Sequence, residues 1–240
     1  MEKVRINKYL ANLGVASRRQ VDKMIEAGEI KINGELPEIG QKVDPSDEID
    51  VNGKIIGKEV KKVYYLLNKP QQVLSATSDP TDRKLVVDFI KCPERIYPIG
   101  RLDYDTEGII LMTNDGDVVN KILRSSSKIY KTYVAKVKGK ISERKIMLLE
   151  EGIYLEDGLT LPAKAKILEY EKNYTWVEIQ IREGRNRQVR RMFSEVGYPV
   201  MFLRRIGIGK FKIGDMRPGQ YRKLSNSEVK YIKELKEREE

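Results

Sequence analysis

The residues best suited to chemistry stand in one glycine-bounded segment, residues 100–108, where an aspartate comes two positions after an arginine. Arg101 and Asp103 are followed by the apolar run 109–112, whose length and branched side chains indicate a buried strand. The residues at 114–116 are Asn-Asp-Gly and favour a turn. We therefore expect Asp103 to be held at the edge of a rigid sheet, where its carboxylate is available for chemistry.

Histidine is absent from the sequence, so imidazole can serve neither as a general base nor as a metal ligand. This absence excludes Ser-His-Asp and Cys-His hydrolases, zinc deaminases and most zinc enzymes. A single cysteine, Cys92, excludes an intramolecular disulfide and a cysteine metal cluster, and it favours a reducing compartment. The chemistry that remains belongs to carboxylate, lysine, tyrosine or arginine side chains.

The charge of the chain predicts an anionic partner. Lysine and arginine number 46 against 36 aspartates and glutamates, a net charge of +10. Residues 1–60 hold 10 basic and 11 acidic side chains, so residues 61–240 hold 36 basic and 25 acidic ones, a net charge of +11. A polyphosphate backbone is the commonest partner for such a surface. We also expect a soluble chain, because no stretch approaches the roughly 18 apolar residues of a membrane span.

A second group of basic residues lies at 185–193, where the spacing predicts a helix. Its inward stripe, at i, i+3, i+4 and i+7, consists of Val189, Met192, Phe193 and Val196. At about 100° per residue, Arg190 lies on the border of this stripe and could reach a partly buried carboxylate. The other three arginines would face outward toward phosphates: Arg185, Arg187 and Arg191.

The remaining sequence predicts a mixture of helices and strands. Residues 131–137 alternate in character and should form a strand with Tyr133 on its buried face. Ser17-Arg18-Arg19-Gln20 should open a helix as a capping box. Further strands are predicted at residues 30–32, 48–51, 63–68 and 176–181, and further helices at 4–16, 117–123 and from 228 onward.

Three motifs stand in order along the chain: GRLDYDTEGIILMTNDG from residue 100, Lys-x-Tyr at residues 131–133, and REGRNRQVRRM from residue 182. Together they resemble the RsuA/RluB/RluE/RluF family of ribosomal-RNA pseudouridine synthases. The resemblance implies that Asp103 is catalytic, that Tyr133 stacks on the target base and that Arg190 pairs with Asp103. Arg101, inside the first motif, is expected to contact RNA. Residues 124–126, Arg-Ser-Ser, depart from the His-Pro-Ser that relatives commonly carry there.

The N-terminal part resembles the S4 RNA-binding module over RINKYLANLGVASRRQVDKMIEAGEIKINGE. The basic residues expected to contact RNA in this module are Lys8, Arg18 and Arg19. Residues 57–62 suit a linker, so we place an S4 domain at residues 1–60 and a catalytic domain at residues 63–240. The fold class implied is α+β: a small N-terminal S4 domain followed by a pseudouridine synthase domain with a mixed, largely antiparallel sheet flanked by helices.

The resemblance implies an enzyme that isomerises uridine to pseudouridine in ribosomal RNA without a cofactor or a metal. REGRNRQVRRMF and GDMRPGQYR look most like the RluB branch, so we expect large-subunit (23S) rRNA as substrate, with small-subunit (16S) rRNA as the alternative. A non-catalytic, ribosome-associated S4 protein would share the basic surface but would not explain the three motifs. Whether Asp103 attacks C1′ or removes the C2′ proton stays open. We expect a cytoplasmic monomer whose partner is ribosomal RNA.

Overall fold

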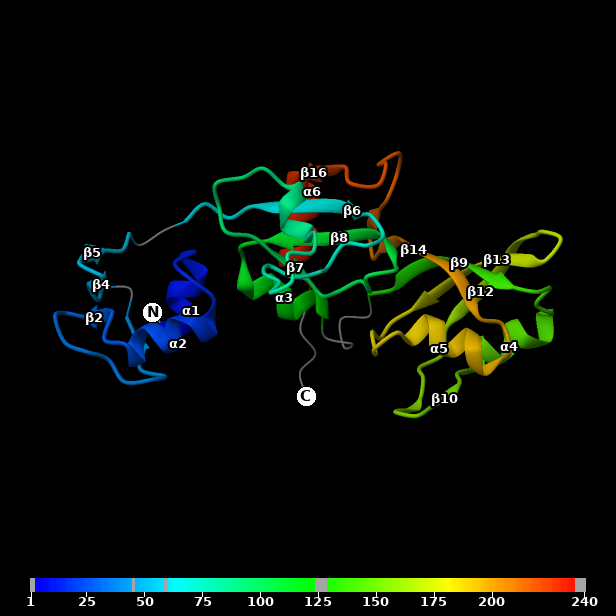
Figure 1. Cartoon of the computed structure of the whole chain (residues 1–240), viewed down its shortest axis with the longest axis horizontal. Helices are drawn as coiled ribbons and strands as arrows, with labels where there is room; N and C mark the ends of the chain where they lie inside the picture. The colour runs from blue at the N-terminus through cyan, green and yellow to red at the C-terminus, as the bar shows by residue number, and fades with distance from the viewer. Residues whose placement is uncertain (1–2, 45, 58–59, 124–128, 236–240) are drawn as a thin grey trace. The chain divides into compact units, whose positions relative to one another are not determined.

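The computed structural model describes residues 3–44, 46–57, 60–123 and 129–235 (Figure 1). The chain divides into two compact units. The first comprises Met1–Val63, Cys92–Arg95 and Asn114–Gly116, and the second comprises Tyr64–Lys91, Ile96–Thr113 and Asp117–Glu240. The Arg-Ser-Ser segment at 124–126 and the middle of the predicted linker lie outside the described residues. None of the helices in the described ranges is long and apolar enough to cross a membrane.

The first unit packs two helices against short strands. Its elements are β1 (Val4–Arg5), α1 (Ile6–Asn12), α2 (Arg18–Glu26), β2 (Ile30–Ile32), β3 (Lys42–Val43), β4 (Ile49–Val51) and β5 (Lys54–Ile55). The predicted cap of α2 is present, because Ser17 Oγ accepts a hydrogen bond from the Gln20 N–H at 3.2 Å. The predicted Asn-Gly turns also form, with Asn33 and Asn52 both at a φ of 52°. One apolar cluster joins the helices to the strands, and it includes Ile6, Leu10, Val21, Ile30 and Ile49.

The second unit is built on a nine-stranded sheet in the order β12-β13-β9-β14-β8-β6-β16, with β15 paired to β14 and β7 paired to β8 (Figure 1). The strands are β6 (Tyr64–Lys69), β7 (Tyr97–Ile99), β8 (Glu107–Thr113), β9 (Lys131–Lys138), β12 (Lys164–Tyr170), β13 (Tyr174–Ile181), β14 (Val200–Ile208), β15 (Phe211–Lys212) and β16 (Tyr221–Lys223). A separate hairpin joins β10 (Tyr154–Leu155) to β11 (Gly158–Leu159).

The centre of this sheet is the parallel pair of β14 and β8, in which Arg205 lies opposite Gly108. The other neighbouring strands described in the sheet run antiparallel. The mixed, largely antiparallel sheet predicted from the sequence is therefore confirmed. At the parallel pair, a Cβ on Gly108 would lie only 2.3 Å from the Arg205 carbonyl oxygen, and Gly108 has a φ of +123°. Only glycine lets these two strands approach so closely.

Helices flank the sheet as expected for an α+β unit: η1 (Val86–Phe89), α3 (Gly116–Leu123), α4 (Glu143–Glu151), α5 (Gln188–Glu195) and α6 (Asn226–Lys233). Side chains from α3 and α6 pack with the central strands in one core cluster, which contains Leu66, Ile109, Val118, Ile122 and Ile232. Every residue of β8 is buried. The loop that precedes β8 and carries Asp103 is therefore anchored directly to a fully buried strand.

Candidate active site

Asp103 lies in the short connection between β7 and β8. A tight turn forms here, because the Thr106 N–H donates to the Asp103 carbonyl oxygen at 3.0 Å. Leu102 is buried beside it with 6% of its surface exposed, whereas the Asp103 side chain keeps 26% exposure. The carboxylate therefore stands at the rim of the sheet on a backbone that is fixed on both sides, as predicted from the sequence.

The loop after β6 is hydrogen-bonded to this connection through three residues. Ser75 Oγ accepts a hydrogen bond from the Leu102 N–H at 3.0 Å and donates one to the Leu102 carbonyl oxygen at 2.9 Å. The Gln72 N–H donates to the Tyr104 carbonyl oxygen at 2.7 Å. The Gln71 side chain donates to the Asp105 carbonyl oxygen at 3.1 Å. These contacts hold the backbone on each side of Asp103. None of the three residues that make them was predicted from the sequence.

Two arginines approach the turn from the segment around α5, and their roles differ from the predicted ones. Arg190 was expected to pair with Asp103, but its Nη2 lies 3.1 Å from the Asp105 Oδ2 and 3.1 Å from the Asp105 carbonyl oxygen. The arginine within ion-pair range of Asp103 is Arg187, whose Nη1 lies 3.8 Å from the Asp103 Oδ2. Arg187 also contacts the Asp105 carboxylate at 3.3 Å.

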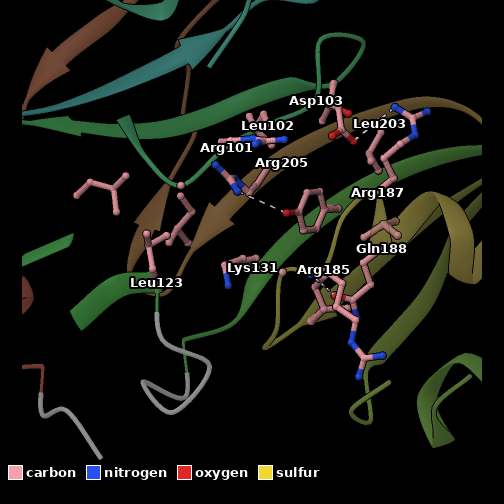
Figure 2. Close-up of a pocket in the computed structure, with 18 of the residues that line it drawn as sticks. Arg101, Leu102, Asp103, Leu123, Lys131, Arg185, Arg187, Gln188, Leu203 and Arg205 are labelled. Carbon is pink, nitrogen blue, oxygen red and sulfur yellow. Dashed lines mark hydrogen bonds and ion pairs between the residues drawn. The ribbon is translucent and has the colours of Figure 1, made fainter. Parts of the chain in front are cut away.

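The unexpected position of Arg187 follows from where the helix begins. Helix α5 starts at Gln188, so Arg187 is its N-cap, with a left-handed backbone at φ 47° and ψ 31°. A projection at 100° per residue places a side chain correctly only when that residue is helical. Outside the helix, the side chain of Arg187 turns back toward Asp103 (Figure 2).

The turn carries a second carboxylate, that of Asp105, and the neighbouring arginines stabilise its ionised form. Burial raises the pKa of Asp105, but the hydrogen bond from Arg187 and the charges of Arg190 and Arg187 outweigh it, so the net pKa is below its usual value. For Arg190, burial lowers the pKa, while the charges of Asp105 and Asp103 oppose that shift. Arg190 therefore acts on Asp103 mainly by holding the adjacent turn.

The other two arginines predicted to face outward, Arg185 and Arg191, make hydrogen bonds within the protein that were not predicted. Arg185 donates to the carbonyl oxygens of Gly158 and Leu159 at 2.8 and 2.6 Å. Arg191 forms a two-pronged pair with the Asp157 carboxylate, with both distances at 2.9 Å. These bonds fasten the β10–β11 hairpin to α5. Because carbonyl oxygens and a carboxylate occupy both guanidinium groups, the structure gives these residues a role within the protein.

Tyr133 and its neighbours come from adjacent strands on the other side of the turn. Tyr133 on β9 pairs in register with Arg205 on β14, and both are buried, at 8% and 4% exposure. Arg205 Nε donates to the Ile109 carbonyl oxygen at 2.8 Å, and its Nη1 lies 3.5 Å from the Tyr133 hydroxyl. Lys131, two residues before Tyr133, donates to the Glu183 carbonyl oxygen at 3.4 Å. Burial and, to a smaller extent, the charge of Arg205 lower the pKa of Lys131 to about 8, while the charge of Glu183 opposes the shift.

These side chains share one pocket of about 180 Å³ (Figure 2). Its lining includes Arg101, Asp103, Lys131, Tyr133, Arg187 and Arg205. Pockets that enclose drug-sized ligands are commonly about 300–1,000 Å³, so this one suits a single base or nucleotide. Arg205 was not predicted as a site residue from the sequence. The alternation along its strand could have indicated it, because Arg205 shares its strand face with the buried Leu203 and Gly207.

The basic residues predicted in the S4 module lie on the helices of the first unit. Lys8 is on α1, and Arg18 and Arg19 form the first turn of α2. Arg18 and Arg19 are exposed, and Arg18 Nη2 lies 3.4 Å from the Asn7 Oδ1. Their contact with RNA stays a prediction, as does that of Arg101, which is exposed at the pocket of the second unit.

The sequence matches two family models, one described as RNA pseudouridylate synthase over residues 63–195 and one described as the S4 domain over residues 4–49. The chain belongs to the RNA pseudouridine synthase family. Within it the RsuA/RluB/RluF group predicted from the motifs is confirmed. The chain is therefore an RNA pseudouridine synthase, and Asp103, Tyr133, Arg187 and Arg190 lie within the segment that matches the synthase model.

Relatives match this synthase along nearly all of its length. The ribosomal large subunit pseudouridine synthase B of Bacillus subtilis (strain 168) is 47% identical over 235 residues, 96% of each chain. The dual-specificity RNA pseudouridine synthase RluF of Escherichia coli (strain K12) is 38% identical over 94% of this chain and 77% of its own. A solved pseudouridylate synthase is 31% identical, covers 95% of this chain and 99% of its own, and superposes with a TM-score of 0.69.

Proposed function

We propose that this synthase converts a specific uridine of large-subunit (23S) ribosomal RNA to pseudouridine. The observation that carries the proposal is a carboxylate, Asp103, on a fixed turn beside a base-sized pocket that contains Tyr133. The choice of RNA is supported by the 47% identity, over 96% of both chains, to a relative named for the large ribosomal subunit. We further propose that the enzyme acts in the cytoplasm as a monomer.

The reaction breaks the N1–C1′ bond of uridine, rotates the uracil and forms a C5–C1′ bond, after which C5 loses its proton and N1 gains one, so that the product is an isomer of the substrate. Asp103 is the group we assign to the sugar, either as the nucleophile at C1′ or as the base that takes the C2′ proton. Both routes need an ionised carboxylate close to the sugar. Arg187 Nη1 lies 3.8 Å from the Asp103 Oδ2, and Arg190 holds the neighbouring Asp105.

The target uridine has to leave its stack before Asp103 can reach it, because the sugar carbon is inaccessible inside a helix. We assign to Tyr133 the face on which the flipped base stacks, a contact worth about 1–3 kcal/mol per base. Tyr133 lines the same pocket as Asp103, which supports placing the flipped base between the two side chains.

The proposed S4 domain, residues 1–60, would hold a structured RNA element through Lys8, Arg18 and Arg19. The proposed catalytic domain, residues 63–240, would add Arg101 at the pocket. Support comes from the two compact units and from the two family models, which match residues 4–49 and 63–195. Phosphate contacts of this kind position the RNA and leave the choice of base to other groups.

The direct test is to map pseudouridines in ribosomal RNA from cells that lack the gene. We expect one large-subunit site to be lost, restored by the wild-type gene and left unrestored by the gene carrying Asp103→Asn. The same lysates allow the variant protein to be quantified, so that poor expression is recognised. Loss of a small-subunit site, or of no site in ribosomal RNA, would overturn the substrate assignment.

A further inference from the structure

The face of the sheet opposite the pocket carries a groove of about 410 Å³. The groove lies over β13, β9 and β14, three adjacent strands (Figure 1). Because successive residues of a strand point to opposite faces, Val134 and Lys136 on β9 point away from Tyr133. All the lining side chains are partly exposed: Val134, Lys136, Trp176, Phe202, Arg204 and Ile206. The groove is therefore separate from the pocket and open to solvent.

The strand register places an ammonium between two aromatic side chains in this groove. Lys136 is paired with Trp176 on β13 and with Phe202 on β14. The two rings meet edge to face, with 5.9 Å between their centroids. Lys136 Nζ lies 5.1 Å from the Trp176 ring centroid, and the Arg204 guanidinium carbon lies 5.3 Å from that of Phe202. Aromatic rings and cations therefore alternate on a partly exposed surface.

Two cations beside this row of rings keep donors for an anion. Arg204 pairs through Nε with Glu107 at 2.6 Å, and its Nη1 and Nη2 make no hydrogen bond with any described residue. Lys138 is exposed and makes no ion pair within the described ranges. The charge of Lys136 is balanced by Glu171 at 2.6 Å. Arg204 is paired with the residue two before Lys136, and Lys138 is two after it, so the two cations flank the rings.

Unpaired RNA fits this surface better than a second protein does. The core of a protein–protein interface is depleted of charged residues, lysine among them, whereas Lys136 lies at the centre of the groove. Surfaces that bind single-stranded nucleic acid combine cations with aromatic rings on which bases stack. RNA-binding sheets present such rings on an open face. The substrate of this synthase is an RNA, so a strand of the required chemistry is brought to the enzyme.

We propose that the groove between Trp176 and Phe202 binds unpaired nucleotides of the RNA substrate, away from the target uridine. A base stacks on the two rings, and Arg204 and Lys138 bind phosphates on either side of it. The inference rests on the proposed function, since it takes the bound strand to belong to the ribosomal RNA that enters the pocket. The groove adds affinity for the RNA without touching the reacting nucleotide.

Trp176 is the single tryptophan of the chain, so its fluorescence reports on this groove. The full-length enzyme is titrated with an oligocytidylate of about ten nucleotides, within the site sizes of single-strand-binding folds. This probe contains no uridine and cannot react. A base that stacks on the indole should quench its emission, whereas RNA bound only at the pocket, on the other face of the sheet, should leave the emission unchanged. The fluorescence anisotropy of a labelled copy measures binding independently.

Phe202→Ala should raise the Kd measured by this quenching about tenfold, because one of the two stacking rings is lost. Met201→Ala is the matched control, since Met201 is the exposed neighbour of Phe202 on β14, and its Kd should equal that of wild type. Lys138→Met should make the Kd less dependent on salt by about one phosphate contact. With a ribosomal RNA fragment as substrate, Phe202→Ala should raise KM more than it lowers kcat. Thermal unfolding checks that the variants fold.

The proposal is overturned if the oligocytidylate binds without changing the emission of Trp176, or if Phe202→Ala and Met201→Ala have the same Kd. Emission that responds to ribosomal subunits but not to protein-free ribosomal RNA would assign the groove to a protein partner and would also overturn it. Failure of the proposed function is distinct, because then no large-subunit RNA fragment is isomerised, whatever the emission of Trp176 does.

Discussion

Asp103 is positioned mainly through its backbone. Ser75 holds the residue before it, and the Thr106 N–H closes the turn on its carbonyl oxygen. Among the residues that the structure describes, the cation within ion-pair range of the carboxylate is Arg187 at 3.8 Å, and that arginine is 46% exposed. A long, partly solvated ion pair holds a carboxylate weakly. The side chain therefore stays free to react while its attachment point is rigid.

Replacing Asp103 by asparagine should abolish turnover and leave the fold intact. The amide is isosteric and the main restraints act on the backbone, but a neutral group can neither attack C1′ nor accept a proton. Tritium released from C5-labelled uridine in RNA measures turnover, and RNA affinity provides the control. Release at a rate close to that of wild type would contradict the assignment.

Arg190→Lys should lower kcat about tenfold or more and affect KM less. The planar guanidinium binds the Asp105 carbonyl oxygen, the Asp105 carboxylate and the Val200 carbonyl oxygen together, whereas an ammonium cannot span these positions. Single-turnover kinetics at saturating RNA measure this loss. Arg187→Lys is the comparison, and its more exposed side chain should cost less. Equal rates for Arg190→Lys and wild type would rule out a positioning role.

The activity should fall as the pH rises above about 8. Burial lowers the pKa of Lys131 to about 8, so the lysine loses its charge over that range, between Arg205 on one side and Glu183 on the other. Lys69 is also buried and its pKa is also about 8. Lys131→Arg separates the two, because an arginine stays charged and should remove the decline in kcat/KM. A decline unchanged in that variant would point to Lys69.

The positions of Asp103 and Tyr133 were predicted better than the residues that support them. Asp103 lies at the edge of the sheet and Tyr133 on a buried strand face, as expected, because their motifs are local and their strands have clear patterns; their roles in the reaction stay predictions. Arg187 was misplaced because a helical projection was extended one residue beyond the start of α5. The contacts of Arg185 and Arg191 within the protein were not predicted because their partners, in the hairpin at 154–159, are about 30 residues away in the sequence, where no local pattern reveals them; whether these arginines also contact RNA stays a prediction.

Among the elements, those with simple patterns were predicted and those with interrupted patterns were not. The strands predicted at 63–68, 131–137 and 176–181 were found within two residues of their ends. No prediction was made for β14, although it lies at the centre of the sheet. Adjacent arginines at positions 204 and 205 interrupt its apolar run. Arg205 is buried in the folded sheet, where β14 pairs with β8 and β9. Those strands are distant from β14 in the sequence, so no local pattern predicts this burial.

The start of α6 makes a pH-dependent contribution to stability. The Arg222 hydrogen bonds, both at 2.7 Å, are the largest cause that lowers the pKa of Glu228 from 4.5 to about 2. Because the folded pKa is the lower one, the contribution is full above about pH 4.5 and is lost as the pH falls toward 2. The pair is partly exposed, so about 1 kcal/mol is expected.

Glu228→Gln should therefore lower the free energy of unfolding by about 1 kcal/mol at neutral pH, with the gap to wild type closing between about pH 4.5 and 2. Thermal unfolding of both proteins across this range measures the gap. Lys230 and Glu234, an exposed pair on the same helix, offer a control, and Glu234→Gln should change little. A gap that stays constant down to pH 2 would rule out the ion pair as its source.

On the scale of the whole molecule, the excess of basic residues is unevenly distributed along the chain. Residues 61–240 carry a net charge of +11, whereas residues 1–60 are nearly neutral, with 10 basic and 11 acidic side chains. A large net charge gives RNA affinity that decreases steeply with salt, whereas a few placed cations give orientation. The first unit should therefore matter more for which RNA is held than for the total strength of attraction.

Charge reversal at Lys8, Arg18 and Arg19 together should raise the Kd for the ribosomal RNA fragment at least about tenfold, because several phosphate contacts are lost. The single-turnover rate at saturating RNA should stay within about twofold, since the pocket is untouched. Lys54→Glu, an exposed change on β5, is the control for net charge. A comparable rise in Kd for that control would show that these three positions are not specific contacts.

The parallel pair of β14 and β8 has a mechanical consequence. The strands join over two residue pairs only, Arg204 with Glu107 and Arg205 with Gly108, whereas β14 and β9 are paired over seven. This short pairing separates the sheet into two parts, one that ends at β14 and one that begins at β8. Asp103 precedes β8 in one part, and Tyr133 lies on β9 in the other. The carboxylate and the aromatic ring therefore belong to two parts of the sheet that, among the described residues, are joined by only these two residue pairs, so the distance between the two groups depends on the geometry of this short parallel pairing.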